Sequence, residues 1–193
     1  MPNWCNNTVE IRHEDPAMIE RVKKGFAEGK LLNEFLPVPE DLQIVAGRVG
    51  DDADPKQIEL EAKEKSNIEK YGYANWYDWC VANWGTKWDV GGDGYEPSDI
   101  PGGVVVSFDS AWSPPIDAFA TLVDQFGFSI RAYYYEGGMN FAGIWEDGDD
   151  DFYDLAGSSA EVREQIPEAL DEMFGISENM EMWEEENAEE ESE

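Results

Sequence analysis

The chain has 193 residues, 44 of them acidic and 13 basic, and its formal net charge at pH 7 is −31. A negative field of this strength repels nucleic acid and anionic membranes, so direct binding to either is not expected, and it attracts cationic protein surfaces. With 41% hydrophobic and 13% aromatic residues, the chain is still expected to fold, as one domain with an insertion and an acidic end.

The N-terminal part of the chain predicts a strand, a helix and a polar insertion. Residues 4–13 alternate between apolar and polar side chains, as in a half-buried strand. Asp15 and Pro16 suit the N-cap and the first position of a helix, which the apolar spacing carries to Gly29. From about residue 41 to 72 the sequence turns polar, which predicts a solvated helical insertion.

The middle of the chain is rich in tryptophan and then alternates between strand and helix patterns. Trp76, Cys80 and Trp84 fall on one stripe of a helix over 73–84, and this stripe must be covered by another part of the protein. A further helix begins at 113–115 and ends at Phe126, and strands are expected at 85–90, 104–110, 128–135, 140–145 and 152–155.

This order of elements predicts an α+β fold of the ferredoxin-like type. In this split βαβ arrangement two helices cover one face of an antiparallel sheet, here with extra C-terminal strands. Residues 1–157 would form the domain, 158–177 a C-terminal helix, and 178–193 an acidic tail. The apolar spacing within the C-terminal segment predicts one continuous helix over 161–174.

Four sequence blocks carry a resemblance to a known family. They are residues 1–7 (MPNWCNN), 83–89 (NWGTKWD), 108–115 (FDSAWSPP) and 138–143 (GMNFAG). Over roughly residues 1–145 the chain resembles the YubB-type ferredoxin-like domain family of bacteriophage and plasmid proteins. The resemblance implies a ferredoxin-like fold and an origin in a mobile element, and it implies no catalytic residues.

Few residues suit catalysis or metal binding. His13 is the only histidine, which excludes catalytic triads and zinc sites that need several imidazoles. Cys5 and Cys80 are expected to be two buried, reduced thiols. The acids at 146–151 lack the glycine position and the distal glutamate of a calcium loop. We therefore predict no metal, no cofactor and no enzymatic activity.

A ligand-binding or enzymatic alternative uses the middle of the chain. The candidate small-ligand pocket consists of Lys87, Trp88, Asp89 and Trp112. Four acids could also converge on a metal, although no sequence spacing demonstrates that they do: Asp89, Asp93, Asp99 and Asp109. An aromatic core is the competing interpretation of the tryptophans.

The C-terminal quarter holds most of the negative charge. From Trp145 to Glu193 there are twenty acidic residues and one basic residue, Arg163. Carboxylates at such density can imitate DNA, which carries one charge per about 1.7 Å of duplex axis. We therefore predict a stoichiometric inhibitor of the DNA-mimic type, whose partner is a basic nucleic-acid-binding host protein such as a restriction or CRISPR nuclease. The partner-binding residues expected are Asp147, Asp149, Asp150 and Asp151 in a hairpin turn and Trp183, Glu184, Glu185 and Glu186 in the tail.

Other interpretations of the acidic end stay open. It could be a solubilising tail or an adaptation to high salt, and the protein could be a structural or assembly component of a phage. If the acids of the turn serve only binding, their substitution by Asn and Ser should leave the melting temperature unchanged or higher. The start of the chain lacks signal-peptide features and no apolar run reaches membrane-spanning length, so the cytoplasm of a bacterial host is the expected location. The sequence does not predict an oligomeric state.

Overall fold

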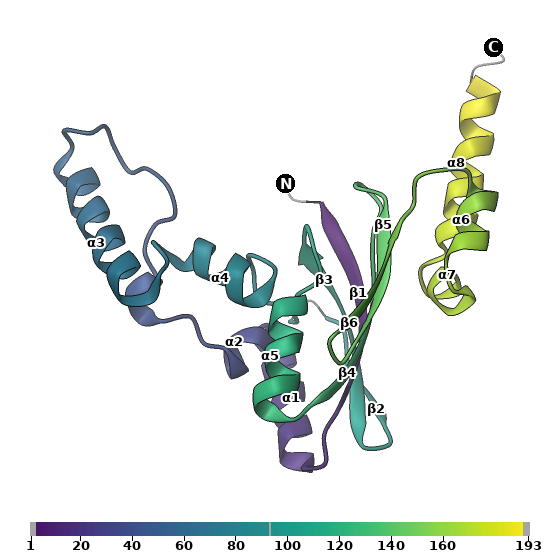
Figure 1. Ribbon diagram of the computed structural model, residues 1–193, viewed down its shortest axis with the longest axis horizontal. Coiled ribbons are helices and arrows are strands. Elements are labelled where there is room, and N and C mark those ends of the chain that lie inside the picture. Colours follow the sequence, from purple (N-terminus) through teal and green to yellow (C-terminus); the bar gives the residue numbers. More distant parts are fainter. Residues whose placement is uncertain (1–2, 93, 191–193) are drawn as a thin grey trace.

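The computed structural model describes residues 3–92 and 94–190. Its centre is one six-stranded sheet with the strand order β2-β3-β1-β4-β5-β6, in which every neighbouring pair is antiparallel (Figure 1). The strands are β1 (Trp4–Arg12), β2 (Ser98–Ile100), β3 (Gly103–Ala111), β4 (Ser129–Glu136), β5 (Phe141–Glu146) and β6 (Asp149–Asp154).

Four of these strands have the ferredoxin-like connectivity. β1 and β2 run parallel with β3 between them, and β3 and β4 run parallel with β1 between them. The two crossovers contain α1 (Pro16–Ala27) and α5 (Ile116–Phe126), so two split βαβ units interlock. The fold is therefore ferredoxin-like α+β as predicted, and β5 and β6 extend the sheet beyond β4.

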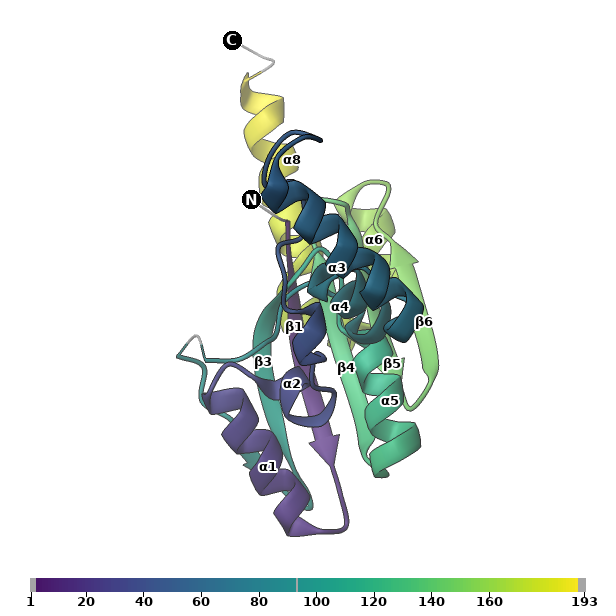
Figure 2. The same ribbon diagram turned by 90° about the vertical axis from the view of Figure 1, so that its left-hand side faces the viewer.

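One face of the sheet packs on α1 and α5 and forms the main core (Figures 1 and 2). The alternation in β1 buries Cys5, Val9 and Ile11 under these helices, because successive side chains of a strand point to opposite faces. Asp15 begins α1, where its side chain accepts a hydrogen bond from the Ala17 backbone N–H. Sequence pattern and cap chemistry agree on where these two elements begin.

The predicted strand at 85–90 is wrong, and the second strand of the ferredoxin-like unit is β2 instead. The segment forms no ladder of backbone hydrogen bonds with a strand of the described sheet. The Thr86 hydroxyl donates to the Ala111 carbonyl at 3.0 Å, and the Val90 carbonyl accepts from the Leu31 N–H at 3.4 Å. The segment thus ties α4 to the core as irregular chain.

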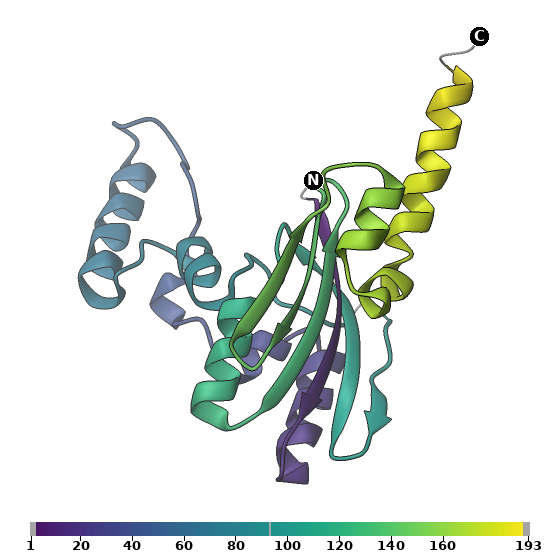
Figure 3. The same ribbon diagram turned by 45° about the vertical axis from the view of Figure 1, so that its right-hand side comes forward.

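The insertion between α1 and β2 contains α2 (Leu31–Phe35), the 3₁₀ helix η1 (Glu40–Leu42), α3 (Pro55–Tyr71) and α4 (Trp76–Trp84). Helix α3 occupies the polar stretch and stands away from the sheet as an arm (Figures 1 and 3). The tryptophan stripe of α4 is covered in part: Cys80 and Trp84 are buried, whereas Trp76 is only half-buried. The Trp84 indole donates to the Leu36 carbonyl at 3.1 Å.

The C-terminal segment forms three helices, α6 (Ser159–Gln165), α7 (Glu168–Phe174) and α8 (Ile176–Glu190). The single helix predicted over 161–174 is wrong, because Pro167 holds Ile166 in an extended conformation with ψ of 153°. The acidic segment predicted as a tail is helical as far as Glu190, and residues 191–193 lie outside the described chain.

These three helices cover the second face of the sheet over β4, β5 and β6 (Figures 1 and 3). A second apolar cluster lies between them, formed by Ala142, Leu155, Val162, Ile166, Leu170 and Ile176. The sequence predicted helices on one face only, so this partial third layer is a finding of the structure. Across residues 3–92 and 94–190, no helix is both long and apolar enough to span a bilayer.

Candidate functional site

The acidic hairpin between β5 and β6 has a turn of only two residues, Asp147 and Gly148. Both have positive φ, 48° and 113°, as in the Asp-Gly turns that suit hairpins. Asp149 pairs with Glu146, so residues 149–151 belong to β6, at the edge of the sheet. The prediction that all four acids lie in the turn is therefore wrong for three of them.

Two of the four acids of the hairpin hold the fold together. Asp147 accepts hydrogen bonds from the Ile130 N–H at 2.6 Å and the Ser129 hydroxyl at 3.0 Å, which fastens the turn to β4. Asp150 accepts a bond of 2.7 Å from the hydroxyl of Tyr134, a side chain that is almost fully buried. These carboxylates already have partners within the chain.

The other two, Asp149 and Asp151, are exposed on the opposite face of β6. Asp151 lies opposite Ile144, which packs against the second cluster, so both carboxylates are on the face that carries α6 to α8. Arg131 lies on this face of the sheet in β4, and its guanidinium binds both carboxylate oxygens of Glu146, at 2.6 and 2.7 Å. Asp149 and Asp151 are thus available to a partner.

The glutamates of α8 likewise include residues bonded within the chain and residues that are exposed. Glu184 accepts from the backbone N–H and the hydroxyl of Ser159, both at 2.8 Å, and so fastens α8 to the start of α6. Glu181 pairs with Arg163 at 3.2 Å. Glu185 and Glu186 are exposed.

Trp183 lies on the same helix and is 67% exposed. An indole exposed to this extent among carboxylates is a candidate contact for a partner, because tryptophan is among the residues that most often dominate binding energy. The term acidic surface is used below for these exposed residues of two elements, β6 and α8: Asp149, Asp151, Trp183, Glu185 and Glu186.

Three of the four residues predicted for a ligand pocket gather at one end of the sheet. The Lys87 ammonium lies over the rings of Trp88 and Trp112, at 3.9 and 4.0 Å from their centroids. Trp4 joins them with its ring centroid 5.9 Å from that of Trp88. The cluster is an exposed cation–π arrangement, in which the indoles already surround a cation of the protein itself.

Asp89, the fourth residue predicted for the pocket, points away from this cluster. Its carboxylate accepts from the backbone N–H groups of Leu32 at 2.7 Å and Asn33 at 3.0 Å, at the start of α2. Burial raises the pKa of this carboxyl, and the backbone N–H groups counteract that shift. Asp89 therefore holds α2 against the segment after α4.

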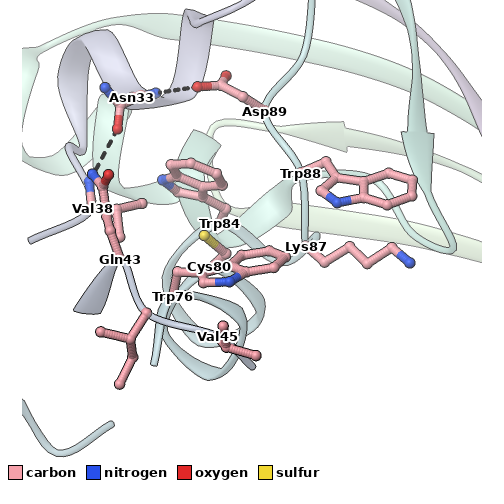
Figure 4. A pocket seen from close by; sticks show the side chains of 11 residues that line it. Asn33, Val38, Gln43, Val45, Trp76, Cys80, Trp84, Lys87, Trp88 and Asp89 are labelled. Carbon is pink, nitrogen blue, oxygen red and sulfur yellow. Dashed lines mark hydrogen bonds between the residues drawn. The ribbon is translucent and has the colours of Figure 1, made fainter. Parts of the chain in front are cut away.

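A groove of about 550 Å³ lies beside α4, between that helix and the chain around η1 (Figure 4). Trp76, Cys80 and Trp84 line one side, and Val38 and Val45 line the other. Figure 4 shows the Lys87 side chain extending away from this hollow and Asp89 turned toward Asn33. The groove is therefore mostly apolar. Of the four residues predicted for a pocket, Lys87, Trp88 and Asp89 are among those that line it, whereas Trp112 is not.

The four acids considered for a metal do not converge where the structure describes them. Asp99 pairs with Lys23, Asp109 accepts from the Asn6 amide at 2.6 Å, and Asp89 caps α2. Asp93 lies outside the described residues. Within residues 3–92 and 94–190, no group of three or more His, Cys, Asp or Glu side chains is arranged to hold a metal ion.

Both cysteines are buried and free, as the sequence predicted. Burial raises the pKa of Cys5 and of Cys80 to about 12. A thiol with so high a pKa is neutral near pH 7 and is a poor nucleophile. Neither residue suits covalent catalysis.

Sequence reasoning missed two contributors to these surfaces. Trp4 alternates outward at the start of β1, which its exposed position in the strand pattern could have suggested. Ser159, whose hydroxyl donates a hydrogen bond to Glu184, follows the N-cap residue Ser158. The Ser-Ser-Ala-Glu sequence indicates the helix cap. It does not indicate the hydrogen bond between Ser159 and Glu184, which is 25 residues later in the chain.

Comparisons with known proteins bear on the fold. Residues 83–193 match the family model described as the ferredoxin-like domain in Api92-like protein. Among solved structures, the crystal structure of the protein Api92 from Yersinia pseudotuberculosis is similar at 13% identity and a TM-score of 0.41, over 82% of this chain and 99% of that chain. The curated proteins give no match. The matched family model agrees with the predicted ferredoxin-like fold and does not confirm the resemblance to the YubB-type family.

Proposed function

Because this chain belongs to the family of ferredoxin-like domains in Api92-like proteins, and a fold by itself assigns no function, we propose a function from its surface: stoichiometric binding to a cationic, nucleic-acid-binding protein. The acidic surface of α8 and β6 would occupy the groove in which that partner holds nucleic acid. The chain would act by competition and would catalyse no reaction.

The observation that carries this proposal is the imbalance of charge after β5. Arg163 is the one basic residue from Trp145 onward, and it is already paired with Glu181. Asp149, Asp151, Glu185 and Glu186 are exposed and form no ion pair with another residue that the structure describes. Unpaired carboxylates around a few apolar side chains suit a complex in which electrostatics steer the encounter and aromatic residues hold it.

The charge density of α8 supports the comparison with DNA. Its 15 residues include seven glutamates. At a rise of 1.5 Å per residue the helix is about 22 Å long, so its sequence carries a charge about every 3 Å. One strand of DNA carries a charge about every 3.4 Å along the axis. The helix therefore resembles one phosphate strand more closely than a whole duplex.

The resemblance to the YubB-type proteins of phages and plasmids narrows the proposed partner. Mobile elements benefit from disabling host nucleases, so we propose a restriction or CRISPR nuclease, or another nucleic-acid-binding host protein, as the target. The protein would then serve in anti-defence in the bacterial cytoplasm.

Affinity capture from a bacterial lysate at low salt, followed by competition with duplex DNA, tests the proposal. The test variant combines Asp149→Asn, Asp151→Asn, Glu185→Gln and Glu186→Gln, all at exposed positions. The control has the same change in charge elsewhere: Asp78→Asn, Asp124→Asn, Glu69→Gln and Glu96→Gln.

We expect the natural chain and the control to capture one nucleic-acid-binding protein that added DNA displaces, and the test variant to lose most of it. Binding should also weaken steeply with added salt. Equal capture by the test variant, or a complex that binds DNA at the same time, would contradict competition.

The groove beside α4 favours a second candidate function, binding of a small apolar ligand. Its volume of about 550 Å³ and its indole lining are typical of ligand pockets. The aromatic probe 1-anilinonaphthalene-8-sulfonate should bind there. Val45→Asp at the rim of the groove should abolish that binding, while Val49→Asp, in the same segment but outside the lining, should not. Equal probe binding by both variants would reject this candidate.

A further inference from the structure

A cleft of about 450 Å³ lies beneath α8, between that helix, the β4–β5 turn and the chain that follows β6. Tyr135 and Asn140 line it from the turn side, and Asn179, Trp183 and Glu184 line it from α8. It is more enclosed than the groove beside α4 and belongs to the acidic end of the protein. It is also separate from the tryptophan cluster around Lys87.

The polar groups of the cleft are mainly acceptors, and its lining within the described part of the chain includes no basic residue. The Glu184 oxygens each accept one bond from Ser159, and a carboxylate oxygen has room for a second. Asn179 uses its N–H₂ in a long bond of 3.4 Å to the Phe174 carbonyl. Within the described residues, the Asn179 Oδ1, the Asn140 amide and the Tyr135 hydroxyl form no hydrogen bond.

The rim of the cleft adds an aromatic surface. Trp183 is 67% exposed, so one side of its ring remains open to a ligand. Burial, and to a smaller extent the charge of Glu136, raise the pKa of Tyr135. Its hydroxyl is neutral near pH 7, as that of an ordinary tyrosine is. The cleft thus combines an indole, a carboxylate, amide oxygens and a neutral hydroxyl.

We propose that this cleft receives an arginine side chain of the cationic partner. A guanidinium is flat, carries five N–H donors in a fixed fork, and stacks on aromatic rings. It therefore matches an indole beside several oxygen acceptors better than the point charge of a lysine does. That the arginine belongs to a cationic partner rests on the proposed function. That the cleft suits a guanidinium is inferred from its lining residues alone.

The test uses the full chain and three probes: L-argininamide, L-lysinamide and glycinamide. The indole N–H signal of Trp183, assigned from Trp183→Phe, reports binding in ¹H–¹⁵N spectra. We expect a saturable shift with L-argininamide, an affinity at least about 3-fold lower for L-lysinamide, and no saturation with glycinamide. Equal responses to L-argininamide and L-lysinamide would overturn the proposal, because general charge attraction would then suffice.

Two variants check the location. A second reporter is the side-chain amide of Asn140, which both variants retain. Trp183→Leu should weaken L-argininamide binding about 5-fold, the factor for a cation–π contact of about 1 kcal/mol. Asn179→Ala should weaken it about 3-fold, whereas Trp88→Leu, at another exposed indole, should not change it. Unchanged affinity in both cleft variants would reject the site.

The outcome is separable from that of the capture experiment. If capture depends on the acidic surface but L-argininamide does not bind the cleft, the competition proposal stands and the arginine site is rejected. If L-argininamide binds as expected but neutralising the acidic surface leaves capture unchanged, the cleft is an arginine site and the competition proposal fails.

Discussion

Individual carboxylates in this protein fall into two classes, and the difference decides what a mutation reports. Asp147, Asp150 and Glu184 accept hydrogen bonds from within the chain. Asp149, Asp151 and Glu185 are exposed and accept none from side chains or backbone in residues 3–92 and 94–190. Substituting a residue of the first class changes stability as well as charge. The expectation that neutralising all four acids of the hairpin leaves the melting temperature unchanged or higher must therefore be restricted to Asp149 and Asp151.

Asp147→Ala should lower the free energy of unfolding by about 1–3 kcal/mol, because it removes the acceptor of the Ile130 N–H and the Ser129 hydroxyl. Alanine also tolerates a φ of 48° less well than aspartate. Urea unfolding measures the change. Asp147→Asn, which keeps one acceptor and tolerates the same φ, should cost less, and an Ala variant as stable as the natural chain would contradict this role.

The two cysteines predict a dependence of stability on alkaline pH. Their pKa is about 12 in the folded protein and near the ordinary 9.0 when unfolded. Between these values the unfolded chain loses protons that the folded chain keeps, so the free energy of unfolding should fall as pH rises from about 9 to 12. Urea unfolding of the natural chain and of Cys5→Ala/Cys80→Ala across this range checks it. An equally steep fall in the double variant would contradict the assignment to these thiols.

At the scale of elements, α8 is held by hydrogen bonds between Ser159 and Glu184 as well as by apolar packing. Glu184 binds the N–H and hydroxyl of Ser159, and Ile176 is buried in the second cluster. Arg163 and Asp171 also bond to its first turns, whereas the side chains of residues 181–187 are mostly exposed. Local opening of α8 should therefore require less free energy than opening of the sheet.

Glu184→Ala should speed amide hydrogen exchange in α8 by about 10-fold, the factor that corresponds to losing about 1.4 kcal/mol of hydrogen bonding. Exchange in β1 should stay unchanged. Glu185→Ala, at an exposed neighbouring position, is the control and should have little effect. Equal exchange rates in α8 of the two variants would show that the hydrogen bonds between Ser159 and Glu184 do not stabilise the docked helix.

The sequence predicted elements where local chemistry decides them and failed where distant partners do. Asp15 as N-cap and Pro16 at the first helical position identified the start of α1, and the alternation of side chains identified β1. Gly127 marked the end of α5. Pro167, also readable, was overlooked as a break between α6 and α7. The segment 85–90 has a strand-like composition, but its hydrogen bonds go to Ala111 and to α2, which no local pattern reveals.

The candidate sites show the same limit. The richness of the C-terminal part in acids was plain, but the division between structural and available carboxylates was not, because it depends on Ser129, Tyr134 and Ser159. The cleft beneath α8 joins Tyr135 to Trp183, residues 48 positions apart. Such a juxtaposition follows from the helices that cover the second face, which the order of strands did not predict.

For the whole molecule, a net charge of −31 means that the folded state is opposed by self-repulsion. Raising NaCl from 0.01 to 1 M shortens the Debye length from about 30 to 3 Å. The melting temperature should rise by at least about 3 °C, which corresponds to about 1 kcal/mol for a chain of this size. The melting temperature of the variant with Asp149, Asp151, Glu185 and Glu186 neutralised should rise less over the same range of NaCl. A melting temperature that falls with salt would show that attractive ion pairs dominate instead.

The two apolar clusters use successive parts of the chain. The main core runs from Cys5 to Trp145, whereas the buried residues of the second cluster run from Ala142 to Ile176. During synthesis the N-terminal part emerges first, so the ferredoxin-like sheet can assemble before the acidic helices leave the ribosome. Those helices then dock on a preformed surface, and the most repulsive part of the protein joins only after its scaffold has folded.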